Sequence, residues 1–315
     1  MREYREAGTF GATVAIAAMV TAGFSWVPVL MGWCISTIIM LILPIRGEIQ
    51  GKFSAFIILL GGIIVIAAAA LGAEDAFPED STFPFVSAVL LLLLWRAMCG
   101  ERRTPGDVAN ILGIILLLVL AVVVLFGMVD VSWEENTPGL CPWFQVCITV
   151  AATSPWWCLR RGPRSSGTWG WYGASAAICL GLSLLTRGIL GSGLVEQEAF
   201  PLYRAVQTIR ILGVLQRFEA LLAASVLMGA FCILLLSGNR MAEALDILLP
   251  QKPRKWKSGI VILLAFLLEW GFQQLTNITM LETIFWIAAP VLALWVAFAG
   301  KKESEGSIDK SGEGD

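Results

Sequence analysis

The sequence predicts an all-α integral membrane protein with about ten transmembrane helices. Three observations predict this class: the composition, the length of the apolar runs and the distribution of the basic residues. Of the 315 residues, 57% are hydrophobic and only 15% are charged, and the mean hydropathy is +0.77. Soluble domains are about one quarter charged. One globule cannot bury so much apolar surface, so a lipid bilayer is the expected solvent of this chain.

Apolar runs of about 20 residues with few charges are typical of helices that cross a bilayer. In chain order we place them at residues 8–26, 28–45, 53–72, 83–99, 108–128, 143–160, 169–191, 218–238, 258–275 and 280–299. The first run follows Arg2 and Arg5, and a second apolar run follows it almost at once. We therefore interpret the first run as a retained helix and not as a cleaved signal peptide. Residues 1–300 are expected to form a single transmembrane domain.

The basic residues predict the orientation of these helices. With the N-terminus in the cytoplasm, ten spans place all but four of the 22 lysines and arginines on the inner side, as the positive-inside rule requires. Two outer segments, 73–82 and 130–136, are instead acidic. Both termini are therefore expected in the cytoplasm. The polar residues 301–315, rich in Gly and Ser, are predicted to form a disordered cytoplasmic tail.

The exception to the charge rule is the outer segment 198–222, "EAFPLYRAVQTIRILGVLQRFEALL". Val206 and Ile209 fall at helical spacing, and Arg204 and Gln207 are turned elsewhere. This spacing predicts a short amphipathic helix over about 200–214 on the outer face of the bundle. We assign a lid or docking role to three charged residues of the segment: Arg210, Arg217 and Glu219. The alternative is a membrane-surface helix whose arginines contact lipid phosphates.

Two of the predicted spans contain candidate ligand-binding residues. A proline inside a span removes one backbone hydrogen bond, and groups left unpaired in this way are tolerated in a membrane where they line a cavity. The candidates are Thr149, Thr153, Ser154, Pro155 and Trp156 in the sixth run, with Thr13 and Thr21 in the first run. The alternatives are an ordinary proline kink in the sixth run and close packing of helices through small residues in the first.

Glu269 is a carboxylate inside the predicted ninth span. At 1.5 Å per residue it lies roughly 17 Å from the basic loop that precedes this span. Carboxylates within a membrane are unfavourable and often functional, so Glu269 is a candidate for proton or ion coupling. The alternative is a neutral, protonated carboxyl group held by Gln273 or by a neighbouring helix.

The residue types that are missing argue against an enzyme. The sequence contains no histidine, which excludes imidazole metal sites and nucleophiles activated by histidine. Its seven cysteines form no CxxC pair, and the spans contain no paired carboxylates. We expect no cofactor and no metal. The net charge of −2 also argues against nucleic acid as a partner.

Residues 200–222, "FPLYRAVQTIRILGVLQRFEALL", resemble a segment of the endospore germination permeases, the integral B subunits of germinant receptors. The matching residues are Phe200, Pro201, Arg210, Ile211, Arg217, Phe218, Glu219 and Ala220. A looser match covers residues 99–133, which resemble the start of the fifth helix of this family and the short acidic outer stretch that follows it. The chain is short for the family, mostly in the first two spans.

The resemblance implies a member of the amino acid–polyamine–organocation transporter superfamily. It implies a five-plus-five inverted repeat, broken first and sixth helices around a midplane pocket, and an extracellular lid between helices seven and eight. It also implies a small nutrient ligand, an amino acid first of all, A-type and C-type receptor subunits as partners, and a cell membrane or spore inner membrane as the location. The alternatives are a stand-alone secondary transporter coupled to protons or cations, and a diverged membrane partner that does not transport.

Overall fold

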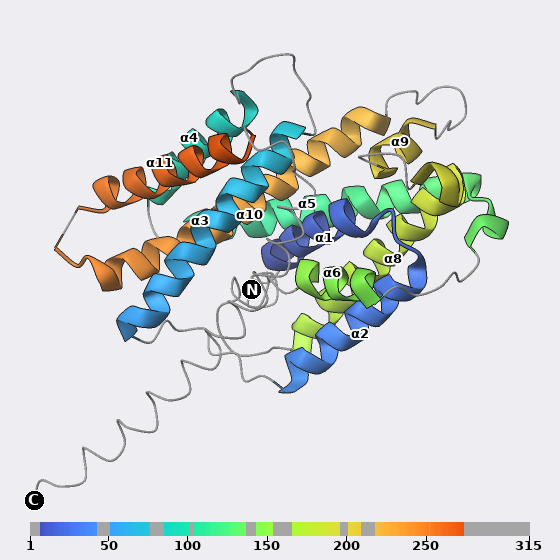
Figure 1. Ribbon diagram of the computed structural model, residues 1–315, viewed down its shortest axis with the longest axis horizontal. Helices are drawn as coiled ribbons and strands as arrows, with labels where there is room; N and C mark the ends of the chain where they lie inside the picture. Colours follow the sequence, from blue (N-terminus) through green and yellow to red (C-terminus); the bar gives the residue numbers. More distant parts are fainter. Residues whose placement is uncertain are drawn as a thin grey trace, which may run out of the picture.

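The computed structural model describes residues 7–42, 51–75, 85–100, 104–136, 143–153, 166–195, 201–208, 218–251 and 253–273, and all regular secondary structure in these residues is helical (Figure 1). The α-helices are α1 (Ala7–Thr21), α2 (Trp26–Ile42), α3 (Gly51–Asp75), α4 (Phe85–Met98), α5 (Thr104–Gly127), α6 (Trp143–Thr153), α8 (Ser166–Val195), α9 (Pro201–Thr208), α10 (Phe218–Leu248) and α11 (Arg254–Gln273). Two short 3₁₀ helices, η2 (Met128–Asp130) and η3 (Trp133–Asn136), follow α5.

The predicted ranges from 8–26 to 258–275 each overlap one of these helices. The largest difference is at α10, which continues to Leu248, whereas the predicted range ended at residue 238. The predicted range ended at residue 238 because charged residues follow it in the sequence. In the structure these charged residues form ion pairs, which are described below. The predicted span 280–299 and the tail 301–315 lie outside the described residues, as do residues 209–214 of the predicted outer helix.

Three helical segments are long and apolar enough to cross a membrane: Gly106–Asp130, Thr168–Val195 and Leu221–Leu248. Shorter apolar helical stretches cover Trp26–Ile39, Ala55–Ala67 and Phe85–Met98. A typical hydrocarbon core requires about 20 residues of helix. These lengths agree with a membrane protein, while the ten-span bundle with an inverted repeat stays a prediction.

The first helix of the chain, α1, lies at the centre of the bundle. α1 contacts α5, α6, α8 and α10 (Figure 1), and its described side chains are all buried. Because its sequence, "AGTFGATVAIAAMVT", consists largely of small residues, neighbouring backbones approach it closely. A Cβ atom on Gly11 would lie 2.6 Å from the Cα atom of Gly113 in α5. Asn110 Oδ1 also accepts a hydrogen bond of 3.0 Å from the Gly8 amide.

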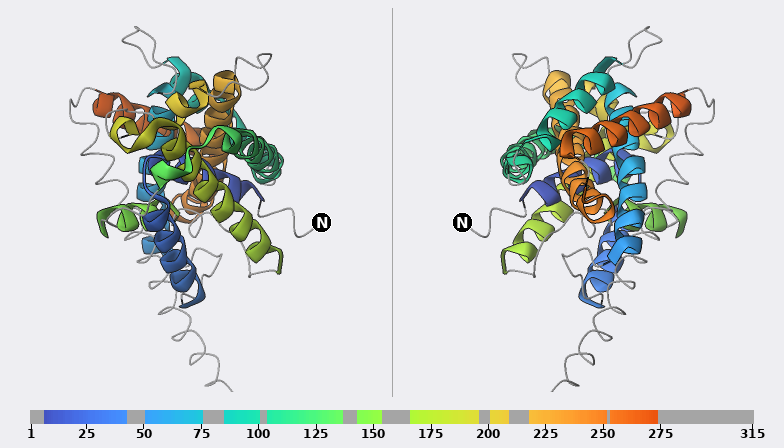
Figure 2. Two further views of the ribbon diagram at one scale, coloured as in Figure 1. Left: turned by 90° about the vertical axis from the view of Figure 1, so that its right-hand side faces the viewer. Right: turned by 90° about the vertical axis from the view of Figure 1, so that its left-hand side faces the viewer.

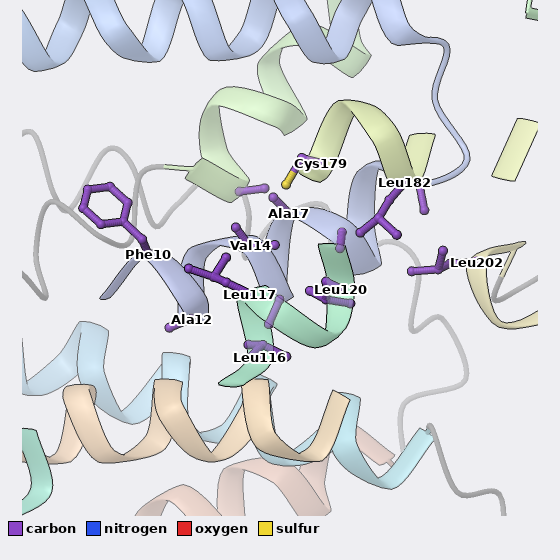
Figure 3. Packing of buried hydrophobic residues seen from close by; sticks show 14 of the residues in the cluster. Phe10, Ala12, Val14, Ala17, Leu116, Leu117, Leu120, Cys179, Leu182 and Leu202 are labelled. Atoms are coloured by element: carbon purple, nitrogen blue, oxygen red, sulfur yellow. The ribbon is translucent and has the colours of Figure 1, made fainter. Parts of the chain in front are cut away.

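The main hydrophobic core surrounds α1. Figure 3 shows side chains of α1 packed against side chains of α5 and α8, with Leu202 of α9 at one edge of the cluster. The labelled members are Phe10, Ala12, Val14, Ala17, Leu116, Leu117, Leu120, Cys179, Leu182 and Leu202. A helix that is apolar on all sides is typical of a buried position or of a membrane span, and α1 is surrounded by neighbouring helices.

A second core joins α3, α4 and α11 to α10. It contains Leu94 of α4, Leu234 and Met241 of α10, and Ala265 of α11. The right-hand view in Figure 2 faces α3, α10 and α11, and the left-hand view faces α2 and α8 at the opposite end of the molecule. Because α10 contributes buried residues to both cores, it connects the two halves.

The outer surface of the bundle is apolar. Large exposed hydrophobic side chains follow one another along α4, α5 and α11: Phe85, Val89, Leu92, Leu93, Val108, Ile111, Ile115, Leu118, Leu125, Ile260, Leu263, Leu264 and Leu267. A soluble monomer rarely exposes such continuous apolar surface. The surface is suited to contact with lipid chains.

Candidate functional site

The structure brings the two predicted threonine-bearing segments together, since α1 packs against α6. Thr13, Thr21, Thr149 and Thr153 are all buried, and each hydroxyl donates to the carbonyl oxygen four residues earlier in its own helix, at 2.6–3.0 Å. A hydroxyl bonded in this way still has acceptor capacity. The remaining candidates of this group, Ser154, Pro155 and Trp156, lie outside the described residues.

The geometry around Thr13 and Thr21 is that of close helix packing. α1 is continuous from Ala7 to Thr21, and the chain turns at residues 22–25 before α2 begins. The break in the first helix that the resemblance implies is therefore not found within α1. In α6, Thr149 faces α2 at a similarly close contact, because a Cβ atom on Gly32 would lie 2.5 Å from the Thr149 Cβ atom.

A buried polar cluster around Tyr172 was not identified from the sequence. The Tyr172 hydroxyl of α8 donates to the Trp33 carbonyl oxygen of α2 at 3.0 Å. Thr37 Oγ1 lies 2.7 Å from the same carbonyl and 3.1 Å from the tyrosine hydroxyl. The tyrosine ring makes edge contacts with Trp33, Phe10 and Trp169, at centroid distances of 4.9, 6.2 and 6.4 Å. Hydropathy does not reveal the cluster, because its members lie in runs that are apolar on average.

Two more polar atoms lie on the same stretch of α2. Trp33 Nε1 is shielded from solvent and has no hydrogen-bond partner in the described part of the chain, and Ser36 Oγ, also shielded, lies within hydrogen-bonding reach of the Tyr172 hydroxyl. Their residues are three apart, so they share one face of the helix. A buried donor without a partner is unfavourable by about 1–3 kcal/mol. This face of α2, next to Tyr172, is therefore suited to a small polar molecule.

The amphipathic helix predicted in the outer segment is α9. Helix α9 packs against α8 and α10 (Figure 1). Its residues Leu202, Ala205 and Val206 are buried, whereas Arg204 and Gln207 are exposed. Arg204 Nη1 donates to Gln207 Oε1 at 3.1 Å. The placement of Val206, Arg204 and Gln207 agrees with the spacing expected for these three residues. Arg210 and Arg217 lie outside the described residues, and so does the side chain of Glu219, the second residue of α10.

The substitution Val206→Asp is expected to detach α9 from the bundle, because Val206 is only 1% exposed and a carboxylate there has no charge partner on the buried face of α9. Limited proteolysis of reconstituted protein should then cut within residues 196–208 faster than in the unsubstituted chain. Gln207→Asp, on the exposed face of the same helix, is the matched control. Equal cleavage rates for the two variants would contradict the docking role of α9.

Several segments converge at this end of α8. Ser183 Oγ donates to the Phe24 carbonyl oxygen in the α1–α2 turn at 2.7 Å, and the Ser132 amide, between η2 and η3, donates to the Gly188 carbonyl oxygen at 3.0 Å. α8 is kinked at Gly191, whose φ of 75° favours glycine. A Cβ atom on Gly23 would lie 3.1 Å from Val195 Cγ1. The α1–α2 turn, the end of α8 and the 3₁₀ segment thus form one packed surface.

Buried charge gathers where α10 meets α11. Lys257 Nζ lies 3.2 Å from Asp246 Oδ1, and its side chain is 3% exposed. Arg240 Nη1 lies 3.2 Å from Glu243 Oε2 within α10. These pairs explain why α10 continues past the predicted end of its span. Further along α11, Glu269 is fully buried, whereas the side chain of Gln273 lies outside the described part.

The described residues contain no group of three or more His, Cys, Asp or Glu side chains that could hold a metal ion. No protein-family model matches the sequence, and none of the curated proteins is significantly similar to it. The described residues form an all-helical bundle with an apolar outer surface, and three of its helices are long and apolar enough to cross a membrane, which indicates an α-helical membrane protein.

Proposed function

We propose that this chain is a permease-like membrane protein that binds a small polar solute inside its helical bundle. The observation that carries the proposal is the polar and aromatic cluster that α2 and α8 form around Tyr172, beside Phe10 of the central helix α1. Polar groups in the interior of a membrane protein are unfavourable unless they have partners, and they often mark the path of a substrate. The bound solute would hydrogen-bond Trp33 Nε1 and Ser36 Oγ.

The aromatic rings narrow the solute class. Trp33, Trp169 and Tyr172 present ring edges and faces around the polar atoms, an arrangement that holds a small molecule with an apolar body and a few polar groups. An amino acid has this form, and it is the ligand class that the resemblance to germination permeases implies. The more specific proposal is therefore a nutrient-binding subunit of a germinant receptor, which associates with A-type and C-type subunits in the cell membrane or spore inner membrane.

Two further observations favour alternatives within the same class. The buried carboxyl group of Glu269 favours a stand-alone transporter that couples solute movement to protons or cations. The close backbone contact of α1 with α5 at Gly11 and Gly113 favours a non-transporting membrane partner, because it limits the movement of α1. Uptake of solute into vesicles distinguishes the two alternatives. A coupled transporter should take up more solute when a pH gradient is present, whereas a non-transporting partner should take up none in either condition.

The proposal predicts that at least one small solute stabilises the purified full-length protein. A ligand at 100 times its dissociation constant raises the free energy of unfolding by about 2.7 kcal/mol. Each of the 20 common amino acids and a set of simple sugars would be tested singly by thermal unfolding. We expect Ser36→Ala and Trp33→Phe to lose most of the stabilisation relative to their own ligand-free values.

The control is Tyr203→Phe in α9, which leaves the Tyr172 cluster unchanged. Stabilisation that survives both α2 substitutions would place the solute elsewhere. The absence of stabilisation by any tested solute would overturn the proposal of an amino acid or sugar permease.

A further inference from the structure

An arginine in α8 is partly buried and lies inside a helix apolar enough to cross a membrane. Arg187 belongs to the segment Thr168–Val195, and its Nε atom is shielded from solvent. Nε has no hydrogen-bond partner in the part of the chain that the structure describes. A shielded cationic donor of this kind is strongly unfavourable unless an anionic group pairs with it.

A second buried donor lies at the start of α2. Ser25 immediately precedes α2, is 3% exposed, and its Oγ atom has no hydrogen-bond partner in the described residues. A serine at this position normally accepts a hydrogen bond from the second or third amide of its helix. The third residue of α2 is Pro28, which has no amide hydrogen. The Ser25 hydroxyl and the positive end of the α2 dipole are therefore available to an anion.

One hydrogen bond places the residue before Ser25 about one helical turn from Arg187. Ser183 Oγ donates to the Phe24 carbonyl oxygen at 2.7 Å and thereby holds the residue next to Ser25 against α8. Arg187 follows Ser183 by four residues, so their Cβ atoms are about 5–6 Å apart on one face. Side chains of a helix lean toward its N-terminus, which directs Arg187 toward Ser183 and the α1–α2 turn.

No described acidic side chain forms an ion pair with Arg187. The bond from the Ser132 amide to the Gly188 carbonyl oxygen places η3 beside the end of α8. The Glu134 side chain of η3 is exposed to solvent, and within the described residues no ion pair joins it to Arg187. The positive charge is thus available to a group from outside the described chain.

We propose that Arg187, Ser25 and the N-terminus of α2 form an oxyanion-binding site at the end of the bundle where α9 docks. The guanidinium group binds two oxygens of a carboxylate or a phosphate, and the serine hydroxyl donates to one of them. The oxyanion belongs either to a small solute or to a lipid headgroup. Ser25 precedes Ser36 by eleven residues of chain, or about 16 Å of helix, so this site is separate from the Tyr172 cluster.

The test uses the full chain in nanodiscs of phosphatidylcholine, at constant ionic strength. The probes are inorganic phosphate, sodium acetate and L-alanine, and a parallel set of nanodiscs contains phosphatidylglycerol. Thermal stabilisation gives an apparent dissociation constant for each soluble probe and an unfolding temperature for each lipid. We expect Arg187→Gln to weaken binding of the probe about 10- to 100-fold, because a hydrogen bond to a charged group contributes a factor of this size to affinity. Ser25→Ala should weaken binding several-fold. Arg204→Gln, at an exposed arginine of α9, is the matched control.

Stabilisation by acetate, phosphate or alanine that depends on Arg187 identifies a solute site. Stabilisation that appears only with phosphatidylglycerol, and again depends on Arg187, identifies a headgroup site; both results support the proposal. It is overturned if no probe stabilises the protein, or if Arg187→Gln and Arg204→Gln have equal effects. Should Arg187→Gln fail to fold, Arg187→Lys and Ser25→Ala provide the same comparison. Alanine binding that requires Ser36 but not Arg187 would support the proposed permease function and overturn this site alone.

Discussion

The substitution Gly113→Ala is expected to lower the free energy of unfolding by about 3 kcal/mol, a large loss for one methyl group. The added Cβ atom would lie 2.6 Å from Gly8 Cα and 2.8 Å from the Ala7 carbonyl carbon, and it would also meet the Ala7 carbonyl oxygen. All three are backbone atoms of the central helix, so no side chain can rotate away. The measurement is unfolding in mixed micelles with increasing dodecyl sulfate, followed by tryptophan fluorescence.

The same change at Gly173 is the matched control. Gly173 lies within α8, and a Cβ atom there would meet no heavy atom within 4 Å. Alanine has a higher helix propensity than glycine, so Gly173→Ala should be stabilising by about 0.5–1 kcal/mol. The two substitutions are thus expected to have opposite signs. A similar small effect at both positions would contradict the close crossing of α1 and α5.

The positions of the helices were largely predictable, because hydropathy is averaged over about 20 residues and individual packing partners do not affect it. The glycines and threonines of α1 also indicated a tightly packed helix, one of the two interpretations that the sequence allowed. The end of α10 was not predictable. Arg240 and Asp246 are unfavourable in an apolar helix on their own, and only the fold brings Lys257 to Asp246.

The candidate site was predicted only in part. The spacing in α9 indicated which side of that helix is buried, because one helix determines its own amphipathic pattern. The Tyr172 cluster depends instead on residues more than 130 positions apart, since Tyr172 bonds to Trp33 and Thr37. No local pattern in the sequence indicates that pairing. In the same way, Arg187 appears in the sequence only as one outer basic residue until the Ser183–Phe24 bond places Ser25 near it.

The substitution Asp246→Asn is expected to lower the free energy of unfolding by about 2–3 kcal/mol. It removes the carboxylate that lies 3.2 Å from Lys257 Nζ, and the lysine side chain, 3% exposed, cannot reach solvent without moving α11. Breaking a fully buried pair is unfavourable by about 3–5 kcal/mol, and the value is lower here because the Asp246 side chain is partly exposed. The loss of free energy of unfolding is measured by unfolding in mixed micelles, as for Gly113→Ala. The control is Asp130→Asn at an exposed carboxylate, which should change the free energy of unfolding by less than about 0.5 kcal/mol.

The double substitution Asp246→Leu with Lys257→Met tests the cause of this loss. If the loss comes from an uncompensated buried ammonium group, removing both charges should return the stability to within about 1 kcal/mol of the unsubstituted protein. The coupling energy from the full double-mutant cycle should then be at least about 1.5 kcal/mol. If the effects of the two single substitutions simply add, the two residues act independently. The Asp246–Lys257 pair would then not stabilise the packing of α11 against the end of α10. A large coupling energy would mean that the extension of α10 beyond residue 238 is stabilised by a contact that forms only when α11 folds back on it.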